Sequence, residues 1–170
     1  MFIQVRHKPP TPLGQPRELI VACAPMRSNV NLSRIVRTAG CCGVSTVIAC
    51  GNAKVIDKIA RDAAEDEAGE HAVEVRIRRT LEHPLKELKL AGYRLVGLEQ
   101  TTNAKSLHEY AFARKCVLVV GNERHGLTDD LLQLLDDVVE IPVYGKPYAY
   151  NAATAASIAL YEFCRQYPRG

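Results

Sequence analysis

The sequence predicts an α/β fold with a mostly parallel sheet and helices on both of its faces. Short β-branched apolar runs alternate with segments that carry helix start and stop signals along nearly the whole chain. Strands alternating with helices imply parallel pairing, because each connecting helix returns the chain to the same end of the sheet. The 170 residues suit one such domain.

The first half of the chain is expected to supply three strands and two helices. The strands are the apolar runs Leu19–Cys23, Thr46–Cys50 and Val73–Ile77. The helices are Val30–Ala39 and Val55–Ala64. Ser28 or Asn29 is expected to cap the first helix, and Gly40 to end it.

The second half is expected to repeat this alternation. Its strands are Arg94–Leu98, Cys116–Val120 and Val138–Ile141, and its helices are Leu85–Leu90, a segment capped by Thr128 that runs through Leu135, and Asn151–Arg165. Gly92 is expected to end the first of these helices in the left-handed conformation. Ser106–Tyr110 is expected to be a short turn or helix.

Residues 1–17 are expected to form a tail, and residues 18–170 one domain. Prolines at 9, 10, 12 and 16 disfavour a packed element in the tail. The tail lacks an apolar core of signal-peptide length, so we expect no export. With 47% hydrophobic and 24% charged residues the composition is that of a globular protein, and no apolar run approaches the roughly 18 residues of a membrane span.

The six cysteines and five histidines show no metal-ligand spacing and no CxxC motif. Five of the cysteines lie within or beside apolar segments, where a free thiol behaves as a small hydrophobe. We therefore expect reduced thiols, a cytoplasmic location and no metal site. The net charge of +3 permits an RNA partner without arguing for one.

Three polar turns carry the available chemistry: Pro25–Arg37, Gly121–Leu127 and Ile141–Asn151. The chain has no GxxxxGK[ST] phosphate loop, GxSxG elbow or HExxH zinc motif. The last two turns follow predicted strands, and α/β proteins usually bind ligands at the carboxyl ends of parallel strands. The sequence therefore predicts a site there, with Glu123 at one strand end and Asn151 beyond the other.

At these turns the sequence resembles the SpoU (TrmH-like) branch of the SPOUT superfamily of S-adenosylmethionine-dependent RNA methyltransferases. The motif N-x5-R-T-A-x3-G is matched by Asn31 through Gly43, and an apolar strand followed by G-N-E-x-x-G-L by Val117–Leu127. A third motif, I-P-M-x-G-x3-S-L-N-V-S before an alanine-rich helix, is matched in part from Ile141 onward. The resemblance covers about residues 18–165.

The resemblance implies an α/β fold with a C-terminal trefoil knot, a homodimer, and S-adenosylmethionine bound among three loops. The implied cofactor-binding residues are Leu98, Gly121, Asn122, Ile141, Ala149, Tyr150 and Asn151. The implied reaction is methyl transfer to a ribose 2′-hydroxyl of RNA, with tRNA the first expectation and rRNA the second. Arg76, Arg78, Arg79 and the Arg6–Lys8 tail are candidates for phosphate contacts.

The implied catalytic residues are Asn31, Arg37, Glu123 and Asn151. A guanidinium stays protonated in proteins, so Arg37 is expected to clamp a phosphate and stabilise the oxyanion while phosphate or water takes the proton. Glu123 would orient Arg37 or the nucleotide, and Asn31 would hold ribose or the Gly121 turn. His125 is the alternative base.

Two departures leave an alternative open. Ala149 and Ala153 stand where the family motif has serines, although Tyr148 and Tyr150 could compensate by stacking on adenine or a base. The alternative is a knotted RNA-binding module with little or no catalytic activity. A nucleotide-binding enzyme of ordinary doubly wound topology would want a glycine loop after the first strand, where PMRSNVN stands instead.

Overall fold

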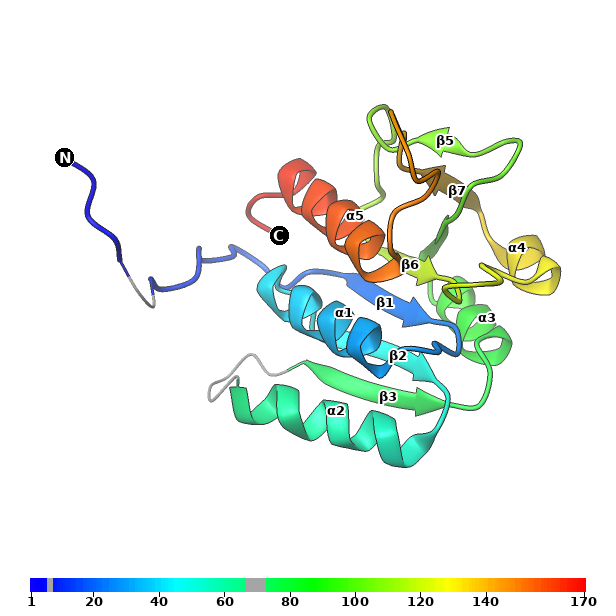
Figure 1. Cartoon of the computed structure of the whole chain (residues 1–170), viewed down its shortest axis with the longest axis horizontal. Helices are drawn as coiled ribbons and strands as arrows, with labels where there is room; N and C mark the ends of the chain where they lie inside the picture. Colours follow the sequence, from blue (N-terminus) through cyan, green and yellow to red (C-terminus); the bar gives the residue numbers. More distant parts are fainter. Residues whose placement is uncertain (6–7, 67–72) are drawn as a thin grey trace.

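Seven parallel strands form one sheet in the computed structural model, which describes residues 1–5, 8–66 and 73–170 (Figure 1). The strand order is β3-β2-β1-β6-β4-β7-β5. The strands are β1 (Leu19–Cys23), β2 (Thr46–Cys50), β3 (Glu74–Arg78), β4 (Arg94–Leu98), β5 (Lys105–Ser106), β6 (Cys116–Val120) and β7 (Asp137–Glu140). Each pairing between these strands is parallel, which confirms the predicted sheet.

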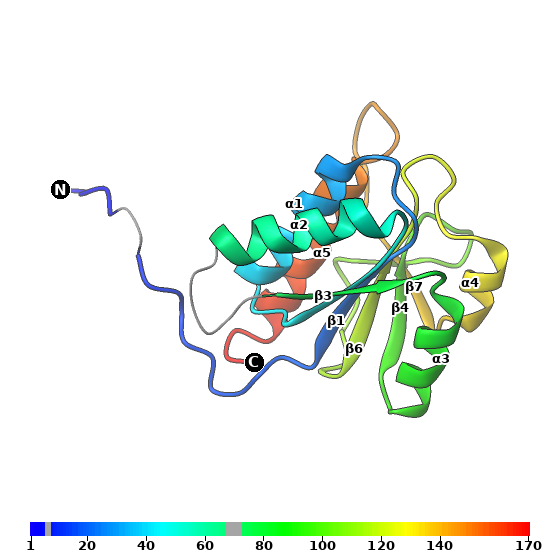
Figure 2. The ribbon, with the colours of Figure 1, turned by 90° about the horizontal axis from the view of Figure 1, so that it is seen from below.

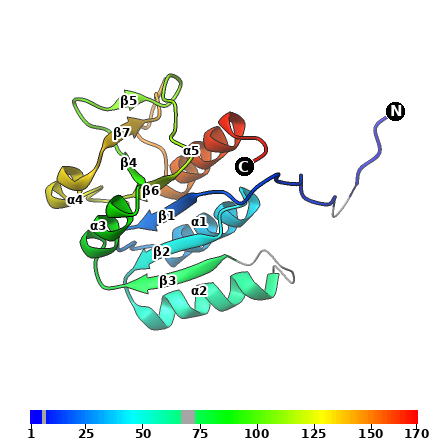
Figure 3. The ribbon, with the colours of Figure 1, turned by 180° about the vertical axis from the view of Figure 1, so that it is seen from behind.

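Helices cover both faces of the sheet, as predicted. They are α1 (Asn29–Cys41), α2 (Ala53–Asp66), α3 (Glu82–Leu90), α4 (Asp129–Leu134) and α5 (Ala152–Gln166). The first two and α5 lie on one face, and α3 and α4 lie on the other (Figure 2). Figure 3 views the sheet from the side of α3 and α4. Alternate residues of β1 enter the two cores, so that Val21 packs under α1 and Ile20 packs toward α3.

Helix ends follow the predicted capping chemistry, with one correction. The Ser28 and Thr128 hydroxyls accept hydrogen bonds from the Asn31 and Leu131 amides, and Gly92 has the predicted left-handed φ of 88°. The prediction that Gly40 ends the first helix is wrong. The helix runs to Cys41, and Gly43 has the left-handed φ of 72° because the chain turns there to begin β2.

The segment between β4 and β6 also differs from the prediction. Its residues 105–106 form β5, a strand that was not predicted and that pairs with the edge of β7, whereas residues 107–109 form the turn expected within Ser106–Tyr110. The Leu107 amide donates to the Glu140 carbonyl and continues this pairing. The reason is tertiary, because the open edge of β7 offers backbone partners that local sequence does not reveal.

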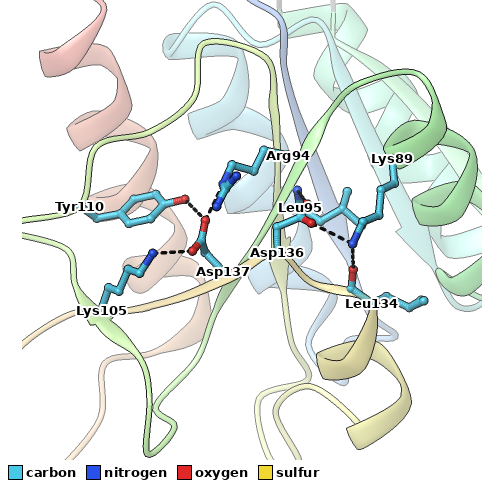
Figure 4. Close-up of polar contacts among 8 residues, drawn as sticks. All are labelled: Lys89, Arg94, Leu95, Lys105, Tyr110, Leu134, Asp136 and Asp137. Carbon is cyan, nitrogen blue, oxygen red and sulfur yellow. Dashed lines mark hydrogen bonds and ion pairs between the residues drawn. The ribbon is translucent and has the colours of Figure 1, made fainter.

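Asp137 fastens this segment to the sheet (Figure 4). The carboxylate of Asp137 is buried and accepts hydrogen bonds from Arg94 Nε at 2.5 Å, Lys105 Nζ at 2.6 Å and the Tyr110 hydroxyl at 2.9 Å. Beside it, Asp136 pairs with Lys89 at 2.8 Å. Burial would raise the pKa of Asp137, but the three hydrogen bonds lower it to about 2.

The same segment contacts the end of α5. Gln166 accepts from the Phe112 amide and donates to the Tyr110 carbonyl, at 2.9 and 2.7 Å. Tyr167 donates its hydroxyl proton to the Phe112 carbonyl at 2.5 Å. The trefoil knot stays a prediction.

Residues 14–17 meet the last residues of the chain beside α5. Gly14 N donates to the Arg169 carbonyl and Arg17 Nη1 to the Tyr167 carbonyl, at 2.8 and 2.6 Å. Residues before these run away from the sheet in Figure 1, and Arg6 and His7 lie outside the described residues. Among the described helices, none combines the length and apolar character needed to cross a bilayer.

Candidate functional site

A cavity of about 470 Å³ lies at the carboxyl ends of β4, β6 and β7. It is bounded by the residues after β4, the turn after β6, the loop after β7 and the first turn of α5. Six residues predicted to bind the cofactor line it: Leu98, Gly121, Asn122, Ile141, Ala149 and Tyr150. Asn151 caps α5 next to this wall and is not a lining residue.

The turn after β6 is closed by its own backbone. Asn122 and Gly126 exchange two hydrogen bonds, at 3.0 and 2.9 Å. A Cβ on Gly121 would lie 2.5 Å from the carbonyl carbon of Gly126, so glycine is required there. The Asn122 side chain donates to the Pro25 carbonyl at 2.7 Å, which ties this turn to the segment before α1.

Glu99 is a lining residue that the sequence analysis missed. It follows the last residue of β4, and its Oε2 accepts a hydrogen bond from the Leu127 amide at 3.0 Å. A Cβ on Gly126 would collide with this carboxylate, so the two positions are packed against each other. The sequence offered a signal for Glu99, because it is a charged residue close to the end of a buried strand, as Glu123 is.

Glu123 holds the N-terminus of α1. Its Oε2 accepts from the Arg27 amide at 2.9 Å, and its Oε1 accepts from the Ser28 amide and Asn31 Nδ2, both at 3.0 Å. Burial would raise the pKa of this carboxyl, but these hydrogen bonds lower it from 4.5 to about 2. A carboxylate at a helix N-terminus is also favoured by the helix dipole.

Asn31 links Glu123 to Asn151. Asn31 is buried, and its Oδ1 accepts a hydrogen bond from Asn151 Nδ2 at 3.3 Å. Asn151 in turn accepts from the Ala153 and Thr154 amides as the N-cap of α5. Three of the four predicted catalytic residues therefore form one chain of hydrogen bonds that joins β6, α1 and α5.

Arg37 is placed differently. It follows Asn31 by six positions on α1, which sets it about 9 Å along the helix axis and about 240° around it. Its side chain is exposed, and it does not line the cavity. Within one chain, the structure thus groups Asn31, Glu123 and Asn151 and leaves Arg37 on another side of the helix.

The cavity suits an organic ligand. Its volume falls within the roughly 300–1,000 Å³ of small-molecule sites. Its charged and titratable lining residues include Glu99, Glu123 and Glu140, with Arg124 and His125 from the turn after β6. In the described part of the chain, no three His, Cys, Asp or Glu side chains are grouped to hold a metal ion.

Comparison with known proteins gives a match to a family model. Residues 18–161 match the model of the SpoU rRNA Methylase family. The chain belongs to this family. The match includes all three polar turns, so we reject the alternative of a nucleotide-binding enzyme with ordinary doubly wound topology.

Two relatives and one solved structure illustrate the similarity of this SpoU-family chain. It is 31% identical over 149 residues to the mouse tRNA (guanosine(18)-2′-O)-methyltransferase TARBP1, covering 87% of this chain and 9% of that protein. It is 29% identical to the Escherichia coli K12 tRNA (guanosine(18)-2′-O)-methyltransferase, covering 88% of this chain and 64% of that one. The crystal structure of the A. aeolicus TrmH/SpoU tRNA modifying enzyme superposes with a TM-score of 0.72 at 26% identity, over 88% of this chain and 75% of that chain.

The two departures from the SpoU motif fall in different surroundings. Ala149 lines the cavity, so a missing hydroxyl there changes the ligand's surroundings. Ala153 is buried in the first turn of α5, where its amide already donates to Asn151. The first departure bears on binding, and the second bears on helix packing.

Proposed function

We propose that this chain transfers a methyl group from S-adenosylmethionine to a ribose 2′-hydroxyl of RNA. The observation that carries the proposal is the cavity itself, built from the three loops to which the family resemblance assigns the cofactor. The relatives' names support the same reaction, although the chain spans only part of their length.

The residues present fit the proposed cofactor. Leu98, Gly121, Ile141 and Ala149 leave backbone and apolar surface for an adenine. The carboxylates of the lining give the cavity negative charge, which favours a ligand that carries a sulfonium and an ammonium group. When bound, S-adenosylmethionine supplies the methyl group.

Asn31, Glu123 and Asn151 act in this proposal by positioning. Their hydrogen bonds fix the turn after β6 against α1 and α5, so the cavity wall is set before RNA arrives. Arg37 acts on the substrate, because its guanidinium can clamp a phosphate and stabilise the developing oxyanion. The proton of the ribose 2′-hydroxyl is transferred to that phosphate or to water.

A homodimer completes the proposed site. Arg37 lies away from the cavity of its own chain, so we propose that a second copy presents its Arg37 to this cavity. Asn31 of α1 and Asn151 at the start of α5 also belong to the chain of hydrogen bonds that includes Glu123. A second copy that contacts these helices would therefore affect the position of the cavity wall.

The proposed substrate is tRNA, with rRNA as the second candidate. The names of the mouse and E. coli relatives favour tRNA, and the family description favours rRNA. Arg76, Arg78 and Arg79 lie along and after β3, at the edge of the sheet, and are proposed to contact phosphates.

The proposed organisation is a tail of residues 1–17 and one methyltransferase domain of residues 18–170. A cytoplasmic location is proposed with it, in keeping with six free cysteines. The second candidate function, a knotted RNA-binding module with little activity, is favoured by Ala149 on the cavity wall.

The test is methyl transfer from labelled S-adenosylmethionine to bulk tRNA and, separately, to rRNA. Arg37→Ala should lower ribose labelling by about a hundredfold or more, as expected for loss of an oxyanion-stabilising group, while the cofactor dissociation constant from calorimetry stays unchanged. Arg61→Ala, which removes an exposed arginine of α2, should label like wild type. Cofactor binding without labelling of either RNA favours the RNA-binding module, and absence of both refutes the methyltransferase proposal.

A further inference from the structure

The loop between β7 and α5 exposes three tyrosines beside the cavity. Tyr144 is 84% exposed, Tyr148 73% and Tyr150 43%. This loop, orange in Figure 2, projects from the body of the molecule. Of the three, Tyr150 lines the large cavity, whereas Tyr144 and Tyr148 do not. The two outer rings are therefore exposed outside the large cavity.

Both outer tyrosines are held in place from the segment after β4. The Tyr144 hydroxyl lies 3.1 Å from His108 Nε2. The carbonyl of Tyr148 accepts a hydrogen bond from Gln100 Nε2 at 3.2 Å. Lys146 Nζ lies 5.8 Å from the centre of the Tyr148 ring and places a positive charge beside it. The contact at its hydroxyl orders the Tyr144 ring and the hydrogen bond at its carbonyl orders the Tyr148 backbone, which lowers the entropy cost of binding a flat partner.

A hollow of about 210 Å³ lies next to Tyr148. It shares Gln100, Glu140, Ile141 and Val143 with the large cavity, so the two spaces adjoin along this edge of the sheet. The carboxylate of Glu140 disfavours a phosphate inside the hollow and can accept hydrogen bonds from the amino or imino groups of a base. Lys146 is not one of the lining residues, so a phosphate can approach it outside the hollow.

We propose that Tyr144 and Tyr148 stack unpaired nucleobases of the substrate RNA, with Lys146 on an adjoining phosphate. This inference rests on the proposed function, because a ribose that reaches the large cavity must carry its neighbouring nucleotides past the loop between β7 and α5. Stacking tolerates any base and requires a single strand, since a base inside a duplex hides its faces. In this proposal Tyr150 contacts the cofactor, and Tyr144 and Tyr148 contact the RNA.

The binding test uses tryptophan fluorescence, because the chain contains no tryptophan. In Tyr148→Trp, an unstructured single-stranded RNA should quench the emission strongly, and the same RNA annealed to its complement should quench it little. Leu90→Trp is the matched control, since Leu90 is 91% exposed on α3, away from the cavity. RNA that binds, as seen by anisotropy of a labelled strand, without selective quenching of Tyr148→Trp would overturn the proposal.

The activity test separates this inference from the proposed function. Tyr148→Ala should raise the KM for RNA about five- to a hundredfold with little change in cofactor affinity, and Tyr148→Phe should restore it because the ring remains. Unchanged KM in Tyr144→Ala and Tyr148→Ala, with methyl transfer intact, refutes the stacking surface alone. Selective quenching with neither cofactor binding nor transfer refutes the proposed function and keeps the stacking surface.

Discussion

Replacing Glu123 by Gln should destabilise the protein in a pH-dependent way. The ionised carboxylate accepts hydrogen bonds from the Arg27 amide, the Ser28 amide and Asn31. A glutamine keeps the shape, but its amide nitrogen would face one of these donors. The lowering of the pKa from 4.5 to about 2 corresponds to about 3 kcal/mol. Because the side chain is partly exposed, solvent screening reduces this to about 1–2 kcal/mol.

The sign of the pH dependence follows from the lowered pKa. The carboxylate's contribution is complete above pH 4.5 and is lost as the pH falls toward about 2. The difference in free energy of unfolding between wild type and Glu123→Gln should therefore be largest near neutral pH and shrink as the pH falls from 4.5 to about 2. Asp137 titrates in a similar range, but it is present in both proteins and cancels in the difference.

Urea unfolding at a series of pH values from about 7 down to about 3, followed by circular dichroism, measures this difference. Glu87→Gln is the control, because Glu87 is an exposed carboxylate of α3 paired with His83 at 3.4 Å, and its loss should change stability by less than about 0.5 kcal/mol. A Glu123→Gln difference of the same size at neutral and acid pH, or one no larger than that of the control, would refute the reasoning.

Three further substitutions test the loop contacts and the site. Asp137→Ala leaves the buried Tyr110 hydroxyl and two cations without their shared acceptor, so urea unfolding should show a loss of about 3 kcal/mol. Gly121→Ala brings a methyl carbon to 2.5 Å from Gly126, so calorimetry should show no cofactor binding and thermal unfolding a loss of about 2 kcal/mol. Asn151→Ala removes the cap of α5 and should cost about 1–2 kcal/mol in thermal unfolding, whereas Asn151→Asp keeps an acceptor for the cap and should cost less. Wild-type stability in Asp137→Ala, cofactor binding in Gly121→Ala, or equal losses in the two Asn151 variants would contradict the respective contact.

The sheet was predictable because its central strands are buried on both faces. β1 and β6 are continuous apolar runs, and β2 is apolar after Thr46. Such runs indicate a buried strand whatever its register or partner. Helix starts were predictable for a local reason, since Ser28 and Thr128 cap an amide only three positions away. Fold class and the order of all elements except β5 therefore needed no tertiary information.

Contacts between distant segments were not predictable in the same way. The acceptor role of Asp137 depends on Arg94 and Lys105, which approach only when β7 docks beside β4 and β5. The position of Glu123 at the end of a buried strand was readable, but its hydrogen bonds to the start of α1 were not. Arg37 shows the same limit, because its place on α1 relative to the cavity depends on how that helix packs on the sheet.

The central place of β6 has a consequence for synthesis of the chain. β1 pairs with β2 on one side and with β6 on the other, so its second edge stays without its partner strand from residue 23 until residue 116 has been made. That edge belongs to the fully apolar run LIVAC, and open apolar edges recruit strands of other chains. A nascent chain that stops before β6 therefore carries an aggregation-prone edge, which closes only when the middle of the sheet has been synthesised.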